Sequence, residues 1–283
     1  MSGTPGLSTL IDIALAEDVG PGDWTTLWTV PAGRDVEAQI IAKADGVIAG
    51  VEAARETFER LDQGLTQDYH VADGDAVAPK QTIVTFRGSA QTILTGERVA
   101  LNFLQQLSGI ATLTREYVRA VEGTGARILD TRKTTPGQRQ LEKEAVRSGG
   151  GLNHRFGLHD MVLIKENHIR AAGGIEAAVS AVRARNELEL AIEVETTNLE
   201  EVRQAVELGV DRILLDNMSS EMLRDAVRLI RTAEKKIEIE ASGGVSLKTV
   251  RGIAETGVDF ISVGALTHSA PALDLSLLVQ LDS

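Results

Sequence analysis

The stretch LAIEVETTNLEEVRQAVELGVDRILLD, residues 190–216, has an aliphatic run at each end and a helical pattern between them. The runs LAIEVE (190–195) and RILLD (212–216) are rich in branched aliphatic residues, as buried parallel strands are. Between them Asn198 precedes Glu201 by three residues, as in a helix capping box, and a glycine stops the pattern before the second run. The stretch therefore predicts a strand, a helix and a second, parallel strand.

Runs of the same kind recur from residue 127 to residue 264, with helical patterns between them. They are RILDT (127–131), MVLIK (161–165), LAIEVE (190–195), RILLD (212–216), IEIEAS (237–242) and FISVG (260–264). Eight strand–helix units close a complete barrel of the TIM type. The six runs predict the α/β class and an incomplete parallel α/β barrel.

The first hundred residues follow another pattern. The strand-like segments VEAQIIAKAD (36–45) and TIVTFRG (82–88) lie on either side of a helical pattern near residues 51–62. Turn-forming residues between them favour antiparallel pairing. We therefore expect an α+β open-faced sandwich at the N-terminus, with Trp24 and Trp28 as packing residues of this domain.

A long amphipathic pattern connects these two parts of the chain. The segment TGERVALNFLQQLSGIATLTREYVRAVEG (95–123) predicts one long helix or a pair of helices broken at Gly109. The domain boundaries that follow are 1–108 for the N-terminal domain and 109–269 for the barrel. We expect the tail, 270–283, to pack back on the N-terminal domain.

Composition excludes several classes of function. The chain of 283 residues has a net charge of −12 and 3% aromatic residues, which disfavours binding to nucleic acid or to an anionic membrane surface. It has no cysteine, so disulfides, thiolate metal sites and a cysteine nucleophile are excluded. The sequence shows neither a secretory signal nor an apolar run of about 20 residues, so we expect a cytoplasmic protein.

Polar residues and glycines stand at or just after the ends of the predicted barrel strands, where parallel barrels carry their active sites. They are Thr131, Arg132, Lys133, Lys165, Glu195, Asp216, Ser242, Gly243, Gly244, Gly264 and Ala265. Each alone has an ordinary alternative role: Glu195 and Asp216 could cap the helices that follow, and the glycines could serve only as turns. Their occurrence at all six ends predicts a shared site.

The basic residues of this set indicate an anionic substrate. Residues 130–170 hold eight Lys or Arg against five Asp or Glu, a local charge of +3 in an acidic protein. Arg132, Arg155 and two lysines, with His154 beside them, suit several phosphates or carboxylates, because guanidinium groups bind such oxygens with two hydrogen bonds.

The acidic residues and glycines of the set indicate a phosphorylated sugar. Glu195 and Asp216 are suited to ribose hydroxyls, or to Mg²⁺ together with phosphates. The sequences Ser242-Gly243-Gly244 and Gly264-Ala265 let backbone N–H groups come close to a phosphate.

Residues 129–168, LDTRKTTPGQRQLEKEAVRSGGGLNHRFGLHDMVLIKENH, closely resemble the signature of quinolinate phosphoribosyltransferase, also called carboxylating nicotinate-nucleotide pyrophosphorylase. Further segments share the resemblance: ERVALNFLQQLSGIAT (97–112), IEVET (192–196), ILLDNM (213–218), EASGGV (240–245) and ISVGALTHS (261–269). The resemblance implies transfer of a phosphoribosyl group from phosphoribosyl pyrophosphate to quinolinate with loss of CO₂. It also implies an N-terminal sandwich beside an incomplete barrel.

The resemblance also assigns roles to individual residues. It implies that Thr131, Arg132, Lys133, His154, Arg155 and Lys165 face the substrates' carboxylates and pyrophosphate, that Glu195 and Asp216 hold the ribose and Mg²⁺, and that Ser242, Gly243, Gly244, Gly264 and Ala265 hold the 5-phosphate. Lys133, Lys165, Glu195 and Asp216 are the expected catalytic residues. Arg98 is expected to reach the site of a partner subunit, which implies a homodimer.

Two other functions remain open from the sequence. Lys165 could form a Schiff base, as lysines at strand ends of barrel aldolases do, although the cations near it in the sequence argue against that. The chain also resembles accessory proteins of molybdenum metabolism that share the fold. In those proteins the segments that correspond to NHR (153–155) and LIKENH (163–168) differ, whereas both are complete here.

Overall fold

The computed structural model describes residues 6–280, and contacts within the chain divide it into two compact units. Unit 1 joins the residues before Glu116, the segment Thr134–Gly150 and the chain from Leu266 onward; unit 2 joins Glu116–Lys133 and Gly151–Ala265. No helix in the described part of the chain is long and apolar enough to cross a membrane.

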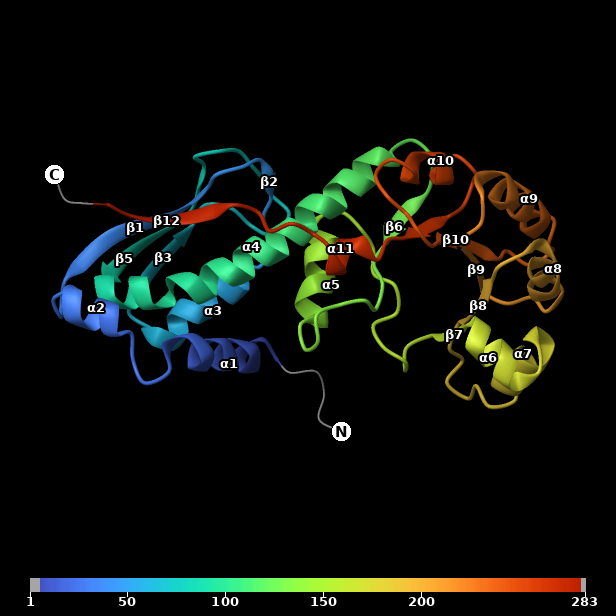
Figure 1. Ribbon diagram of the computed structural model, residues 1–283, viewed down its shortest axis with the longest axis horizontal. Helices are drawn as coiled ribbons and strands as arrows, with labels where there is room; N and C mark the ends of the chain where they lie inside the picture. Colours follow the sequence, from blue (N-terminus) through green and yellow to red (C-terminus); the bar gives the residue numbers. More distant parts are fainter. Residues whose placement is uncertain (1–5, 281–283) are drawn as a thin grey trace. The chain divides into compact units, whose positions relative to one another are not determined.

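Unit 1 is built on an antiparallel sheet. Its strands are β1 (Asp35–Ala42), β3 (Thr66–Tyr69), β5 (Thr82–Ser89) and β12 (Leu275–Gln280), in the order β12-β1-β5-β3. The predicted strands 36–45 and 82–88 are β1 and β5, which are neighbours in the sheet. Strand β12 comes from the end of the chain and pairs with β1 (Figure 1).

The remaining elements of this part of the chain are mostly helices. They are α1 (Leu7–Val19), α2 (Trp24–Thr29), α3 (Val51–Leu61), α4 (Ala90–Ala120), α5 (Arg139–Ser148) and α11 (Ala265–His268), with the short strands β2 (Gly46–Val47) and β4 (Ala76–Val77). Helix α4 continues through Gly109 without a break, which decides between one helix and two. A Cβ at Gly109 would lie 2.1 Å from the carbonyl oxygen of Pro271, so glycine is needed there for close packing, not for a break.

The core of unit 1 lies between its sheet and its helices. Phe58 of α3 and Phe86 of β5 are fully buried, and their ring centroids are 4.5 Å apart. Leu101 and Leu104 of α4 are buried in the same cluster. This packing explains the amphipathic pattern from which the helix was predicted.

The expectation that Trp24 and Trp28 are packing residues of the N-terminal domain is wrong. Their exposed fractions are 49% and 78%, and the two rings stack on each other with centroids 5.5 Å apart. Helix α2 has six residues, and Thr26 is its buried residue. A helix this short buries little surface, so its large aromatic residues cover each other instead.

Unit 2 is an incomplete parallel barrel, as predicted. Its strands are β6 (Arg127–Leu129), β7 (Val162–Ile164), β8 (Ile192–Thr196), β9 (Arg212–Asp216), β10 (Glu238–Ser242) and β11 (Phe260–Ser262), in the order β6-β11-β10-β9-β8-β7. Every neighbouring pair is parallel. Each of the six predicted runs contains one of these strands.

Helices connect the strands of unit 2 along the outer side of the curved sheet (Figure 1). They are α6 (Glu166–Ala172), α7 (Ile175–Arg183), α8 (Leu199–Glu207), α9 (Ser220–Arg231) and α10 (Val250–Ala254). Asn198 caps α8 by accepting a hydrogen bond from the Glu201 N–H at 3.0 Å, as the sequence predicts. The Glu201 carboxylate accepts from the N–H of Thr197 at 2.7 Å, so both ends of this cap are satisfied.

Two aspartates form hydrogen bonds between the amino-terminal ends of neighbouring strands. Asp211, just before β9, accepts a hydrogen bond from the N–H of Ile192 on β8 at 2.8 Å. Asp259, just before β11, accepts from the N–H of Ile239 on β10 at the same distance. These bonds hold the sheet at the end opposite to the predicted site, so the carboxyl ends stay available for chemistry.

Candidate active site

The carboxyl ends of all six barrel strands lie along one rim of unit 2, because every neighbouring pair is parallel. Asp216 at the end of β9 is in register with Ser242 at the end of β10. Lys165 directly follows β7, and Glu195 lies at the end of β8. The fold thus places the predicted strand-end residues on the same rim.

Lys165 and Glu195 form an ion pair across neighbouring strands. The Lys165 Nζ lies 3.0 Å from Glu195 Oε2, and the lysine side chain is 48% exposed. The other oxygen of Glu195 accepts a hydrogen bond from the backbone N–H of Glu166 at 3.3 Å. Schiff-base formation needs an amine that is free to attack a carbonyl, whereas this amine is held by a carboxylate. This pairing argues against the Schiff-base reading of Lys165.

Asp216 is coupled electrostatically to three of the predicted residues. Its partial burial raises the pKa of the carboxyl group, and the negative charge of Glu195 raises it further. Lys165 and Lys133 act in the opposite direction and lower that pKa. The other three residues expected to be catalytic therefore lie close enough to Asp216 to influence its carboxyl group.

A second group of predicted residues comes from the chain after β6 and from the loop before β7. Burial lowers the pKa of the Arg155 guanidinium, and the positive charge of Arg132 lowers it further. Arg155 Nη1 donates to the carbonyl oxygen of Met161 at 3.1 Å, which limits its movement. After β6, Thr131 Oγ1 accepts a hydrogen bond from the backbone N–H of Lys133 at 3.1 Å. Neighbouring cations of this kind favour binding of an anion between them.

The glycines after β10 allow a close approach of two loops. Gly243 has φ +94°, and a Cβ on it would lie 2.2 Å from the side-chain oxygen of Asn217. Asn217 donates through its side chain to Asp216 at 2.7 Å and through its backbone N–H to the Ser242 carbonyl at 2.9 Å. Gly244 is also left-handed, with φ +59°. The turn therefore requires glycine, and its backbone lies against the Asn217 side chain that donates to Asp216.

Two further predicted residues, Gly264 and Ala265, follow β11, the strand beside β10. Arg98 lies on α4 in unit 1, whereas the other predicted site residues belong to unit 2. Its side chain is 57% exposed and lies 3.9 Å from Glu97.

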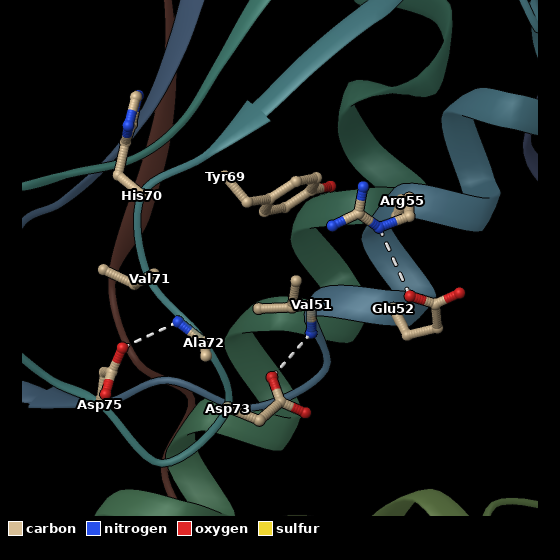
Figure 2. Close-up of a pocket in the computed structure, with 9 residues that line it drawn as sticks. All are labelled: Val51, Glu52, Arg55, Tyr69, His70, Val71, Ala72, Asp73 and Asp75. Atoms are coloured by element: carbon tan, nitrogen blue, oxygen red, sulfur yellow. Dashed lines mark hydrogen bonds and ion pairs between the residues drawn. The ribbon is translucent and has the colours of Figure 1, made fainter.

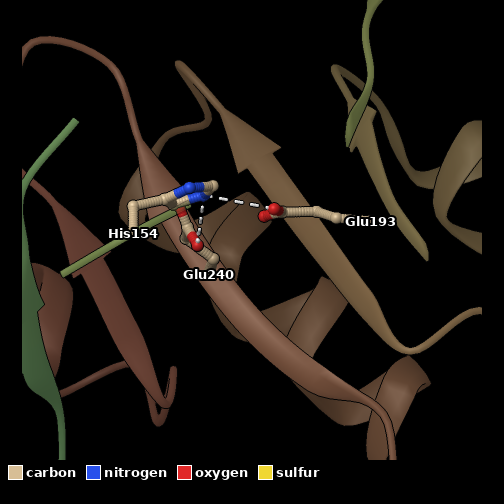
Figure 3. A group of neighbouring side chains, drawn as sticks. All are labelled: His154, Glu193 and Glu240. Carbon is tan, nitrogen blue, oxygen red and sulfur yellow. Dashed lines mark ion pairs between the residues drawn. The ribbon is translucent and has the colours of Figure 1, made fainter. Parts of the chain in front are cut away.

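The sequence prediction missed the acidic partners of His154 (Figure 3). The His154 Nε2 atom lies 3.1 Å from Glu193 on β8 and 3.4 Å from Glu240 on β10, and both glutamates are fully buried. Arg212 of β9 forms a second ion pair with Glu240 at 3.1 Å. The signal for these residues was the glutamate at every second position in IEVE and EIE, which places them on the same face of the strand as Glu195 and Ser242.

The charge of His154 depends on these two acids. Burial lowers the pKa of the imidazole. The hydrogen bonds that the ring donates to Glu193 and Glu240, and the negative charge of these two acids, outweigh the effect of burial and raise the pKa to about 9. On the other side of the ring, Nδ1 accepts a hydrogen bond from the backbone N–H of Arg155 at 2.7 Å. This bond acts against a second proton, because a protonated Nδ1 could not accept it.

Two sets of residues in unit 2 offer oxygen or nitrogen atoms for a metal. His154, Glu193 and Glu240 place ligand atoms within 4.8 Å of one another, but Arg212 already balances part of their charge. Glu195 and Asp216 at the rim are a better fit for Mg²⁺, which prefers carboxylate and phosphate oxygens. The negative charge of Glu195 raises the pKa of Asp216, and a divalent cation would relieve that repulsion.

The hollow in unit 1 beside β3 offers no comparable chemistry (Figure 2). Its charged groups are used within the wall: Asp73 accepts from the N–H of Val51, and Asp75 accepts from the N–H of Ala72. Arg55 lies over the ring of Tyr69, 4.5 Å from its centroid. These side chains hold a loop together, so the rim of unit 2 is the stronger candidate.

Comparison with known families accounts for nearly the whole chain. Residues 23–108 match the model of the quinolinate phosphoribosyl transferase N-terminal domain, and residues 110–278 match that of the C-terminal domain.

Individual relatives agree with the family models. A probable nicotinate-nucleotide pyrophosphorylase [carboxylating] of Synechocystis sp. is 49% identical over 93% of this chain and 89% of its own length. The Bacillus subtilis protein of the same description is 43% identical, over 98% of this chain and 94% of its own. The structure of the nicotinate-nucleotide pyrophosphorylase from Francisella tularensis superposes with a TM-score of 0.92 at 42% identity, covering 97% and 96% of the two chains.

Proposed function

The chain belongs to the quinolinate phosphoribosyltransferase family, and from this membership we propose which of its residues bind and convert the two substrates. It is a decarboxylating transferase of NAD biosynthesis: it moves the 5-phosphoribosyl group from phosphoribosyl pyrophosphate to quinolinate. The products are nicotinate mononucleotide, pyrophosphate and CO₂. The single observation that supports the residue assignment is the ion pair of Lys165 with Glu195 on the rim that also carries Asp216, with Lys133 near enough to act on the Asp216 carboxyl group.

The basic residues bind the anionic groups of both substrates. Arg132 and Arg155 lie close enough for their charges to repel, and the two carboxylates of quinolinate would neutralise both. Lys133 and Lys165 are suited to the pyrophosphate, because a lysine supplies a compact positive charge that adapts to phosphate oxygens. Thr131 and His154 complete this side of the site by fixing the loops from which the cations extend.

The acidic residues act on the ribose. As pyrophosphate leaves, positive charge develops on the sugar ring, and fixed carboxylates near the ring stabilise it. Glu195 and Asp216 take this role in the proposal and would accept hydrogen bonds from the ribose hydroxyls. Pyrophosphate departs with the electron pair of the C1–O bond, and the ring nitrogen of quinolinate supplies the pair for the new bond at C1, so the protein needs no covalent nucleophile.

Glu195 and Asp216 are also the residues that would hold Mg²⁺. When bound, the ion would supply positive charge to the pyrophosphate oxygens. Loss of CO₂ then follows from the ribosylated intermediate itself: the electrons of the bond to the departing carboxylate stay on the ring carbon, where the adjacent positively charged nitrogen stabilises them, and a proton from water takes the place of the CO₂. The protein's part in this step is orientation of the ring by Arg132 and Arg155.

The glycine-containing turns after the last two strands of the barrel bind the 5-phosphate. Gly243 and Gly244 have left-handed backbone conformations, and Gly264 and Ala265 follow the neighbouring strand. Ser242 adds a hydroxyl donor at the start of the first turn. Backbone donors suit a phosphate that takes no part in bond breaking.

We also propose a cytoplasmic homodimer. Arg98 is the one predicted site residue that belongs to unit 1, and an exposed arginine on a long helix suits a contribution to the site of a partner subunit. The absence of cysteine suits a reducing compartment.

The direct test measures pyrophosphate and CO₂ released by the purified protein. We expect equal amounts of both with quinolinate and phosphoribosyl pyrophosphate, and neither when quinolinate is omitted. Nicotinate in place of quinolinate is the matched control, because it lacks the carboxylate that leaves as CO₂. If no release of pyrophosphate depends on quinolinate, the accessory role is favoured and the assignment is overturned.

A further inference from the structure

A layer of buried charged side chains lies below the rim of unit 2, nearer the amino-terminal ends of the strands. Glu193 stands two residues before Glu195 on β8, Glu240 two residues before Ser242 on β10, and Arg212 four residues before Asp216 on β9. Side chains at every second position of a strand share a face, so these three face the same side as the rim residues. We call Glu193, Glu240 and Arg212 the inner charged layer.

The inner charged layer is costly to bury. Glu193 and Glu240 have no exposed side-chain surface, and Arg212 is 17% exposed. Apolar residues of similar volume often stabilise a core as well as or better than buried ions do. Because burial of these charges is costly, we expect the inner charged layer to serve the site above it.

The contacts of the layer converge on His154. Glu240 receives a hydrogen bond from Ser262 at 2.5 Å through one oxygen, and through the other it pairs with Arg212 at 3.1 Å and with His154 at 3.4 Å. Glu193 reaches the same imidazole nitrogen from β8 at 3.1 Å. Figure 3 shows the two carboxylates converging on one edge of the ring.

The two nitrogens of His154 have different roles. Nδ1 accepts the backbone N–H of Arg155, so the proton of a neutral ring resides on Nε2, between the two carboxylates. A doubly protonated ring would carry a proton on Nδ1 as well and could not accept the Arg155 N–H, so the observed bond assigns the ring its neutral form although the two acids raise its pKa. In this form Nε2 is a donor and not a metal ligand, and the acids fix the angle of the ring.

We propose that Glu240, supported by Glu193 and Arg212, is a positioning residue of the transferase: it holds His154 so that Nδ1 fixes the backbone of Arg155. The Arg155 guanidinium, which also donates to the Met161 carbonyl, is then directed at the quinolinate carboxylates. This inference rests on the proposed role of Arg155 in quinolinate binding.

The kinetic test compares Glu240→Gln with Glu238→Gln. Both glutamates lie on β10 and pair with Arg212, but Glu240 also contacts His154, and no such contact is seen for Glu238. Loss of a buried charged hydrogen bond predicts a rise of about tenfold or more in the KM for quinolinate. The KM for phosphoribosyl pyrophosphate should change far less, and Glu238→Gln should resemble the parent protein in both.

The spectroscopic test follows the ring nitrogens of His154 by ¹⁵N NMR in the protein without substrates, with His154→Asn to assign the signals. We expect a protonated Nε2 in the parent protein, a changed signal in Glu240→Gln and an unchanged one in Glu238→Gln. An unprotonated Nε2 in the parent, or a Glu240→Gln protein with parental quinolinate KM and parental His154 signals, would overturn the inference.

A further variant covers the case in which Glu240→Gln does not fold. Ser262→Ala removes only the hydroxyl donor to Glu240, and it should shift the His154 signal and the quinolinate KM in the same directions by a smaller amount. Unchanged values in a folded Ser262→Ala protein would then count against the inference. If the parent protein shows no transferase activity, the proposed function fails, whereas the NMR result still decides whether the layer holds His154.

Discussion

Asp216 illustrates, at the scale of one residue, how the site differs from an ordinary protein surface. Burial and the charge of Glu195 both raise the pKa of its carboxyl group, so the charged form costs the folded protein free energy. A group kept at such a cost is expected where chemistry requires a negative charge.

We therefore predict that Asp216→Asn loses about 100-fold or more in kcat, because a fixed negative charge beside the developing cation is removed. Its thermal unfolding temperature should not fall, since the costly charge is removed with it. The matched control is Asp225→Asn, in which the carboxylate lies on α9 and pairs with Arg228. Turnover close to that of the parent protein would contradict the assigned role of Asp216.

The strand-end residues could be predicted because charged side chains directly after aliphatic runs have a defined place in a parallel barrel. Glu193 and Glu240 could not. Each alternates with aliphatic residues, and this pattern is typical of a strand with one solvated face. Only the curvature of the sheet and the ring of His154 turn that face into a buried interior.

At the scale of secondary-structure elements, Asp211 connects β8, β9 and the chain after α9. It accepts from the Ile192 N–H of β8, precedes β9, and pairs with Lys235 after α9 at 2.9 Å. Burial raises the pKa of its carboxyl group, but these hydrogen bonds outweigh burial and lower it below 3.8. Between the two pKa values the unfolded chain binds more protons at this carboxyl group than the folded chain does. The contribution of the Asp211 carboxylate to stability is therefore complete above pH 3.8 and is lost as the pH falls through the lowered pKa.

Asp211→Ala should therefore lower the free energy of unfolding by about 1–2 kcal/mol near pH 7, as expected for lost hydrogen bonds to a partly exposed carboxylate. The difference from the parent protein should shrink at acid pH. Urea unfolding at several pH values measures both. A pH-independent difference would show that the carboxylate charge is not the cause.

The turn after β10 carries a prediction of its own. In Gly243→Ala the new Cβ would meet the side chain of Asn217, and the left-handed φ of +94° is unfavourable for alanine. We expect the KM for phosphoribosyl pyrophosphate to rise by about tenfold, with the KM for quinolinate much less affected. Gly252→Ala is the control, because a Cβ there has nothing within 4 Å. Equal effects on both substrates would contradict a phosphate-binding role for this turn.

Strands and helices with strong patterns could be predicted, and weakly patterned ones could not. All six barrel strands were found, because their aliphatic runs are bounded by helix signals. The continuity of α4 was left open, since Gly109 could break a helix or, as the structure shows, admit the carbonyl of Pro271. The exposure of Trp24 and Trp28 was missed, because the pattern of a six-residue helix does not reveal which face is buried.

At the scale of the whole molecule, the chain forms two units that sequence order alone does not define. Unit 1 includes Thr134–Gly150 and the chain from Leu266 onward in addition to the N-terminal part. Strand β12 pairs with β1 across nearly the full length of the chain. Such long-range pairing depends on tertiary packing, which local patterns do not encode.

The proposed homodimer predicts complementation between two inactive variants. If each site uses Arg98 of the partner subunit, Arg98→Ala and Lys133→Ala proteins should each be inactive alone. After mixing, unfolding and joint refolding, about a quarter of the parental activity should return, because half of the dimers are mixed and each mixed dimer has one intact site. A mixture with no more activity than the average of the two variants would contradict a shared site.

The central claim is that the cations at the barrel rim bind and convert the substrates, and a single-turnover measurement tests it most directly. In Lys133→Ala and Arg155→Ala we expect the rate of pyrophosphate release to fall by about two orders of magnitude or more with the fold intact by circular dichroism. Lys236→Ala, an exposed lysine just before β10 at the opposite end of the strands, should keep the parental rate. A near-parental rate in folded Lys133→Ala or Arg155→Ala would contradict the claim.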